Sequence, residues 1–200
     1  MGMTLRTVRI GLWAAVVALA LIATAAYFLV KVPGTGQAGT FGAGTYSLVD
    51  GNGGPVTEAS FKGAPSMLFF GYTHCPDVCP TTLSDMAAWF AQLGDEGQPL
   101  KGYFVTVDPE RDTPEVIKDY VASVTDRVTG ITGTPEEIGK ILSAWRVYSK
   151  KVPGVDGEYT MDHTASVFLL NSKGEFEGTI AYQESSTVAI EKLKKLLAKG

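Results

Sequence analysis

Cys75 and Cys79 are the two cysteines of this chain, and three residues separate them within GYTHCPDVCP at positions 71–80. Two thiols this close along a chain can form a small disulfide, bind a soft metal ion, or do both in different redox states. Because no other cysteine is present, a disulfide that serves as scaffolding is a weak explanation. The spacing indicates redox chemistry or metal binding.

A proline follows each cysteine and constrains the backbone. Since a residue before proline is disfavoured in the α region, we expect both cysteines to be non-helical. Pro80 suits the first position of a helix, which makes Cys79 the expected N-cap. The positive end of the helix dipole would favour a thiolate there, the form that binds metal and attacks disulfides. The charge of Asp77, inside the loop, opposes this effect.

A third ligand would decide between redox chemistry and metal binding, and the chain has two histidines. His74 adjoins the first cysteine and reads as a loop residue. His163 lies just before an apolar strand expected at 166–170. In a thioredoxin-like fold that segment lies beside the cysteine loop, where thioredoxins and peroxiredoxins carry a cis-proline, and this chain has no proline after Pro153. A lone histidine is more often an ordinary loop residue than a ligand, but this expected placement favours a ligand.

Two thiolates and one imidazole form a soft, three-coordinate set. Such a set suits Cu(I) best and accepts Cu(II) with a water molecule. Zinc in a structural site usually takes four protein ligands. The residues therefore favour copper, with Met161 as a weaker candidate for an additional soft contact, because core or surface packing is the commoner role of methionine.

The elements expected around these residues follow the thioredoxin-like order. Apolar runs predict buried strands, and Thr-Pro-Glu segments predict helix starts. We expect an α/β domain with a central mixed sheet flanked by helices, an N-terminal hairpin and a separate N-terminal transmembrane helix. The expected elements are a hairpin with its turn at 50–54, strands at 67–71, 103–107 and 166–170, helices at 83–93 and from 113 and 134, a turn at 171–174 into 175–181, and a helix at 186–197.

Residues 10–30 form an uncharged run of 21 residues, which as a helix would be roughly 31 Å long, enough to cross a bilayer core. Arg6 and Arg9 precede the run and Lys31 follows it, so we expect 1–9 to be cytoplasmic and the C-terminal domain periplasmic. A signal peptide cleaved after 23–25 is the alternative. The apolar run continues past that point, which favours an uncleaved, single-pass anchor in the inner membrane.

The rest of the chain divides into a glycine-rich linker at 31–45 and one domain at 46–200. After the first 31 residues the chain has 14 basic and 21 acidic residues, a net charge of −7. An acidic domain is a poor candidate for nucleic-acid binding. Outside the inner membrane, a close cysteine pair tends to be a disulfide unless something reduces it.

Taken together, these motifs resemble the Sco/SenC family, which comprises membrane-anchored copper chaperones for cytochrome c oxidase assembly. The resemblance extends over nearly the whole chain and implies that Cys75, Cys79 and His163 bind one copper ion, as Cu(I) or Cu(II). It also implies that Asp108 supports the site from just outside the ligands. The matching segments are GYTHCPDVCP at 71–80, VDPERDTP at 107–114, GITGT at 130–134, Tyr148, and DHT at 162–164.

The resemblance implies copper delivery to the binuclear copper centre of cytochrome c oxidase subunit II. The expected partners are that subunit, a periplasmic copper donor, a thioredoxin-like reductant and the inner membrane, with no nucleic acid. A metallochaperone of this kind has no catalytic residue. Two alternatives remain: a thiol-disulfide oxidoreductase, in which Cys75 and Cys79 are the redox-active pair and His163 is dispensable, and a copper or redox sensor.

Overall fold

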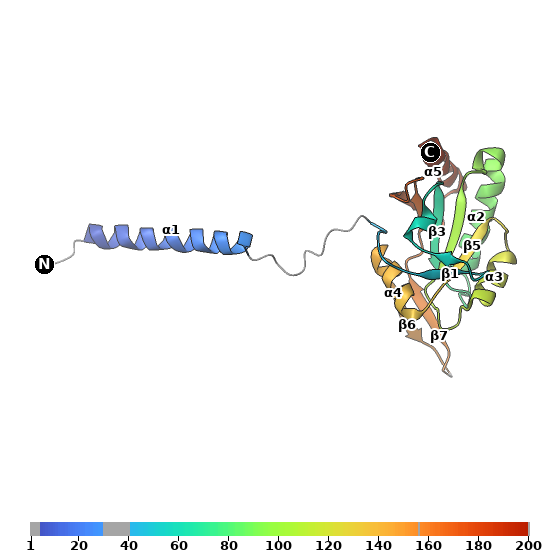
Figure 1. Ribbon diagram of the computed structural model, residues 1–200, viewed down its shortest axis with the longest axis horizontal. Coiled ribbons are helices and arrows are strands. Elements are labelled where there is room, and N and C mark those ends of the chain that lie inside the picture. The colour runs from blue at the N-terminus through green and yellow to red at the C-terminus, as the bar shows by residue number, and fades with distance from the viewer. Residues whose placement is uncertain (1–4, 30–40, 156, 200) are drawn as a thin grey trace. The chain divides into compact units, whose positions relative to one another are not determined.

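The computed structural model describes residues 5–29, 41–155 and 157–199 (Figure 1). The chain forms two units, Met1–Ala38 and Gly39–Gly200. The first unit contains helix α1 (Leu5–Leu29). Within the described parts of the chain, no helix combines the length and the apolar character needed to cross a membrane. The transmembrane segment expected at 10–30 is therefore not found among these residues.

The second unit is built on a mixed sheet of seven strands in the order β2-β1-β5-β4-β3-β8-β9. The three central strands β3, β4 and β5 are parallel, and β1 and β8 join them antiparallel on either side. The outer strands β2 and β9 pair antiparallel with β1 and β8. The strands are β1 (Leu48–Asp50), β2 (Pro55–Val56), β3 (Ser66–Gly71), β4 (Lys101–Thr106), β5 (Val128–Thr132), β8 (Val167–Leu170) and β9 (Phe176–Ile180).

Every residue of β3, one of the three central strands, is buried. A strand buried on both faces needs cover on both sides of the sheet, which explains its continuous apolar sequence. The helices around the sheet are α2 (Val78–Leu93), α3 (Pro114–Ala122), α4 (Pro135–Ala144) and α5 (Ser186–Ala198), with short 3-10 helices at Glu58–Phe61 and Gly94–Gly97. The predicted α/β class, with a central mixed sheet flanked by helices, is thus confirmed.

Helices α3 and α4 begin at the Thr-Pro-Glu segments as predicted, and a threonine caps each of them. The Thr113 hydroxyl accepts a hydrogen bond from the amide of Val116, and the Thr134 hydroxyl accepts one from the amide of Glu137. A proline occupies the first turn of each helix, where its missing amide hydrogen has no intrahelical partner to lose.

Three strands were not anticipated from the sequence. One is β5, and the other two form a separate two-stranded sheet from β6 (Ser149–Pro153) and β7 (Tyr159–His163). We call this pair the β6–β7 hairpin. It carries His163 at its last position, paired with Ser149.

Residues 41–45 were expected to belong to the linker but contact the domain. The Phe41 ring lies 5.4 Å from the Trp145 ring and 4.8 Å from the Phe176 ring, measured between centroids. The amide of Gly42 donates to the carbonyl of Ala144 at 3.0 Å. The packed domain therefore includes Phe41, and the rest of the expected linker, 31–40, lies outside the described residues.

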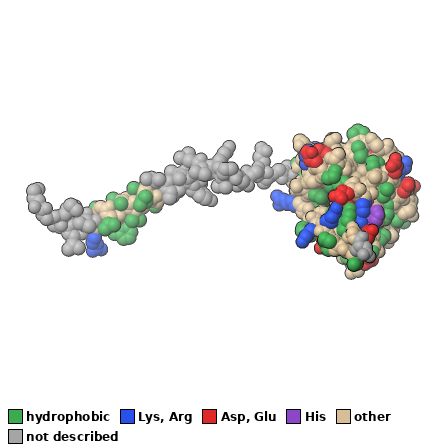
Figure 2. Space-filling model, turned by 90° about the horizontal axis from the view of Figure 1, so that it is seen from below, with side chains coloured by type: hydrophobic (Ala, Val, Ile, Leu, Met, Phe, Trp, Pro, Cys, Tyr) green, Lys and Arg blue, Asp and Glu red, His purple; other side chains and the backbone are tan. Residues whose placement is uncertain are grey.

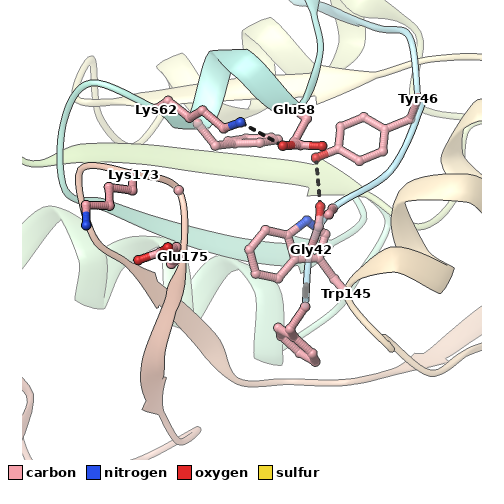
Figure 3. Close-up of a pocket in the computed structure, with 11 residues that line it drawn as sticks. Gly42, Tyr46, Glu58, Lys62, Trp145, Lys173 and Glu175 are labelled. Atoms are coloured by element: carbon pink, nitrogen blue, oxygen red, sulfur yellow. Dashed lines mark hydrogen bonds and ion pairs between the residues drawn. The ribbon is translucent and has the colours of Figure 1, made fainter. Parts of the chain in front are cut away.

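Gly42 shows why this contact is close. Its φ is +86°, and a Cβ there would lie 2.4 Å from the Trp145 ring, so glycine is required. The Tyr46 hydroxyl donates to the Gly42 carbonyl at 3.3 Å, beside the Lys62–Glu58 ion pair (Figure 3). Together these groups border a cavity of about 220 Å³.

Candidate metal site

The two cysteines lie where β3 gives way to α2. The amide of Cys75 donates to the carbonyl of Tyr72 at 3.3 Å, and the amide of Cys79 donates to the Cys75 sulfur at 3.3 Å. Cys75 is partly exposed and Cys79 is buried. One sulfur therefore faces the surface while the other lies against the core.

The prediction that Cys79 is a non-helical N-cap was wrong. Helix α2 begins at Val78, Asp77 is its N-cap, and Cys79 lies in the first turn. The amides of the first turn have no intrahelical acceptor. A helix therefore tolerates proline at its third position, and Pro80 does not mark the start.

Gly71 lets the buried thiol approach the sheet. A Cβ on Gly71 would lie 3.0 Å from the Cys79 sulfur and 3.0 Å from the Phe104 ring. The glycine at the end of β3 is thus explained by space, since its φ is not in the left-handed region. The Cys79 sulfur occupies the volume that any other side chain at residue 71 would need.

His163 reaches the cysteines from the end of β7. Its Nε2 lies 3.4 Å from the Cys79 sulfur, and its Nδ1 lies 3.0 Å from the carbonyl of Thr164. Because a carbonyl accepts hydrogen bonds and cannot donate them, Nδ1 carries a hydrogen, and Nε2 is the ring nitrogen that faces the sulfur. The ligand atoms of Cys75, Cys79 and His163 all lie within 4.8 Å of one another.

Aromatic rings fix the plane of the imidazole. The buried Tyr72 ring is perpendicular to the His163 ring, with 5.7 Å between centroids, and Phe69 lies at 6.2 Å. In front of Cys75 and His163 is an open cleft of about 320 Å³, which Tyr72 and Met161 also border, while Cys79 lies buried behind it. The three ligand atoms therefore form a rigidly backed site that opens towards solvent.

The two thiols have opposite pKa shifts. The pKa of Cys75 falls to about 3, chiefly because Cys79 donates a hydrogen bond to it, with further help from His163 and nearby amides. The pKa of Cys79 is raised because it donates that bond and because it is buried. At neutral pH the pair therefore consists of a Cys75 thiolate and a Cys79 thiol.

Asp112 is a supporting residue that sequence reasoning missed. Its buried carboxylate accepts hydrogen bonds from the Thr73 amide at 3.1 Å, the Thr73 hydroxyl at 2.6 Å and the Thr106 hydroxyl at 2.6 Å. These bonds tie the loop that carries Cys75 to the end of β4. Burial raises the pKa of Asp112, and the hydrogen bonds oppose that rise. The signal was present as the second aspartate of the strand-ending segment VDPERDTP.

Asp108 is also buried, but it lies on the side of the site that carries His163. Its carboxylate binds the Arg111 guanidinium and accepts a hydrogen bond from the Tyr159 hydroxyl at 2.8 Å. It thus contacts the β6–β7 hairpin, which carries His163, rather than the cysteine loop.

The remaining candidates fall outside the ligand group. His74 is exposed, and its Nδ1 lies 3.0 Å from the Thr73 hydroxyl. Met161 is partly buried, packs against the core and borders the cleft. Among the described residues, Cys75, Cys79 and His163 form the one group of three such side chains close enough to hold a metal ion.

Comparisons with known proteins identify relatives of this chain. A family model described as SCO1/SenC matches residues 35–198. The protein "SCO1 homolog, mitochondrial" of Mus musculus is 40% identical over 136 residues, covering 66% of this chain and 48% of that protein. "Protein SCO2, mitochondrial" of Saccharomyces cerevisiae is 33% identical over 158 residues, covering 76% and 52%. The chain spans about half the length of these curated relatives.

For two solved structures, the match with this chain extends over almost the whole of the solved chain. Bradyrhizobium japonicum ScoI with copper bound is 43% identical, with a TM-score of 0.71 over 76% of this chain and 98% of that one. Arabidopsis thaliana ScoI with copper bound is 31% identical, with a TM-score of 0.74 over 80% and 99%. On the family match and these relatives, the chain belongs to the SCO1/SenC family.

Proposed function

We propose that this protein binds one copper ion through Cys75, Cys79 and His163 and passes it to another protein. The observation that carries the proposal is the meeting of two sulfurs and one imidazole nitrogen within 4.8 Å. Soft thiolates with an imidazole suit Cu(I). Two solved relatives, from Bradyrhizobium japonicum and Arabidopsis thaliana, carry copper.

The geometry favours transfer over storage. Three protein ligands leave a coordination position free, and the cleft lets a ligand from another protein approach. Cys75 and His163 are the partly exposed ligands, whereas Cys79 is buried, so exchange would begin at one of these two positions. Copper is in this view a cargo, which moves by replacement of one ligand at a time.

The proposed recipient is the binuclear copper centre of cytochrome c oxidase subunit II, as the sequence resemblance implies. A periplasmic donor would supply the copper, and a thioredoxin-like reductant would keep the cysteines reduced. We place the domain on the outer face of the inner membrane, held there by residues 10–30. The support for this location is the uncharged run with arginines before it. Cell fractionation, with protease added to the outer face, tests this part separately.

Copper titration tests the ligand set. The reduced full chain is titrated with Cu(I) without oxygen, in competition with a chromophoric chelator. We expect one equivalent to bind tightly, and His163→Ala to weaken binding at least tenfold. His74→Ala is the matched control, because it removes the other histidine from an exposed position beside the same loop. Equal affinity in wild type and His163→Ala would refute the assignment.

In cells, transfer is tested by oxidase activity. A strain that carries His163→Ala should lose activity of cytochrome c oxidase at low copper and regain it when copper is added. The His74→Ala strain should behave like wild type. Full oxidase activity with His163→Ala at low copper would exclude transfer as the main role.

One observation supports a second candidate, a thiol-disulfide oxidoreductase. The partly exposed Cys75 has a low pKa while Cys79 is buried, the asymmetry of an attacking and a resolving thiol. The reduced pair would give two electrons to a target disulfide and become a disulfide itself. Reduction of a disulfide peptide should then survive His163→Ala and be lost in Cys75→Ser.

A further inference from the structure

Arg111 joins two parts of the domain that the main sheet does not connect. The β6–β7 hairpin forms its own two-stranded sheet, separate from the seven-stranded sheet that carries β3 and the cysteine loop. At its base, the Thr164 amide donates to the Tyr148 carbonyl, and the Tyr148 amide donates to the Thr164 hydroxyl. These bonds shape the hairpin internally. Apart from the short connection from His163 to β8, which pairs with β3, side-chain contacts position the hairpin against the rest of the domain.

Arg111 supplies contacts of this kind at the start of β7. Its guanidinium carbon lies 3.7 Å from the centroid of the Tyr159 ring, and its Nη1 donates to the Tyr159 carbonyl at 3.1 Å. Asp108 binds the same guanidinium and also accepts the hydrogen bond from the Tyr159 hydroxyl. The backbone, the ring and the hydroxyl of Tyr159 are therefore all held to the segment that follows β4.

The same guanidinium reaches the other side of the site. Its central carbon lies 5.8 Å from the centroid of the Tyr72 ring, which is perpendicular to the His163 ring at 5.7 Å between centroids. Arg111 is thus placed between a tyrosine of the cysteine loop region and a tyrosine of the hairpin. Its side chain is 17% exposed, which strengthens its charged contacts relative to those at the surface.

Lys151 contributes less. Its ammonium lies 4.0 Å from the Tyr159 ring and pairs with Glu110 at 2.8 Å. Both partners of that pair are largely exposed, at 43% and 61%, and exposed pairs are weak. The more buried Arg111 is therefore the stronger fastening of Tyr159.

We propose that Arg111 is a positioning residue: it fastens the β6–β7 hairpin to the end of β4 and so holds His163 against the cysteine pair. Its effect on copper rests on the proposed function, whereas its effect on the hairpin does not. Residues that orient metal ligands without binding metal typically change metal affinity by about 10- to 100-fold. Arg111→Met should weaken Cu(I) binding by this factor.

The test compares Arg111→Met with Arg127→Met in the full chain. Arg127 is a matched control, because it also lies over an aromatic ring, Phe90 at 4.5 Å, and donates to the backbone carbonyl of Gly97. We expect Arg111→Met to lower Cu(I) affinity and Arg127→Met to leave it unchanged. Equal affinity in Arg111→Met and wild type would overturn the proposal.

A double variant shows whether Arg111 acts through the histidine. In the His163→Ala background, adding Arg111→Met should cause no further loss of Cu(I) affinity. A further loss of the same size as in wild type would contradict the positioning role, because the effect would then bypass His163.

Hydrogen exchange of the metal-free protein separates this proposal from copper binding. Arg111→Met should speed exchange of the β6 and β7 amides while those of β3 and β4 remain protected. Unchanged exchange in the hairpin would overturn the proposal, even if wild type failed to bind copper. If Arg111→Met does not fold, Tyr159→Leu serves instead, since it removes the ring and hydroxyl but leaves Arg111 paired with Asp108, and the same outcomes apply.

Discussion

At the scale of single residues, the site depends on an unequal cysteine pair. Cys79 is buried behind Gly71 and donates a hydrogen bond to Cys75, which is thereby kept as a thiolate at the edge of the cleft. A metal ion needs thiolate ligands, so one sulfur is ready to bind before the metal arrives. We expect the Cys79 thiol to lose its proton when a metal ion binds both sulfurs, because the ion then stabilises the Cys75 thiolate in place of the hydrogen bond.

This asymmetry predicts how the reduced protein reacts with iodoacetamide. Alkylation of Cys75 should persist to about pH 4, because the pKa of this thiol is about 3 against a usual value of 9.0. In Cys79→Ala the reaction should require a higher pH, because the largest cause of the shift is removed. Mass spectrometry of alkylation rate against pH measures both. A rate that rises around pH 9 in wild type would contradict the account.

The lowered pKa of Cys75 also makes the stability of the reduced protein depend on pH. A thiol whose pKa is lower in the folded state stabilises that state above its unfolded pKa, near 9, and loses this contribution as the pH falls towards 3. The reduced protein should thus lose, on acidification across this window, a stabilising contribution that Cys75→Ser lacks. Denaturant unfolding at several pH values makes the comparison.

Asp112 gives a second prediction at this scale. Asp112→Ala should lower the free energy of unfolding by about 1–3 kcal/mol, since it leaves the buried Thr106 hydroxyl and the partly buried Thr73 amide without their acceptor. The exposed Asp119, on α3, is the control, and Asp119→Ala should change the free energy of unfolding by about 0.5 kcal/mol or less. Equal stability of the two variants in urea would show that the Asp112 network does not hold the loop.

At the scale of the elements, the site is made by two chain segments that meet over the end of the sheet. The strand end of β3 and the first turn of α2 place the cysteines, and the end of β7 places His163. The strand–helix junction is rigid because β3 is buried throughout. The β6–β7 hairpin, as a separate sheet, depends on side-chain contacts for its position.

Two glycines test the fit at the strand–helix junction. Gly71→Ala should destabilise the protein and weaken Cu(I) binding, because its Cβ would press on the Cys79 sulfur and on Phe104 at 3.0 Å. Gly139→Ala is the control: a Cβ there has no neighbour within 4 Å, and alanine in a helix should add about 0.5–1 kcal/mol of stability. A melting temperature that rises in both variants would contradict the packing of the Cys79 thiol against the end of β3.

At the scale of the whole molecule, the sequence predicted what local patterns encode. The apolar runs of β3, β4 and β8 and the threonine caps of α3 and α4 were readable, because burial and capping leave direct traces in residue order. His163 was selected by its place before β8 and the absence of a later proline. The structure brings this histidine to the cysteines as expected.

Other features depend on contacts that residue order does not reveal. Strand β5 contains Gly130, where a Cβ would lie 3.0 Å from the Ile117 side chain, and this glycine weakens the apolar pattern. No residue of β6 or β7 is fully buried, and β7 alternates only between partly buried and exposed positions, so the apolar signal of the hairpin is weak. Asp112 bonds to Thr73, 39 residues away, and Arg111 bonds to Tyr159, 48 residues away. Their roles follow from tertiary packing.

The most direct test of the central claim is X-ray absorption of the Cu(I)-loaded full chain. The account predicts two sulfur ligands and one nitrogen ligand for one copper ion, with loss of the nitrogen in His163→Ala and its retention in His74→Ala. A copper ion bound by sulfur alone in wild type, or an identical spectrum in His163→Ala, would contradict a site built from Cys75, Cys79 and His163.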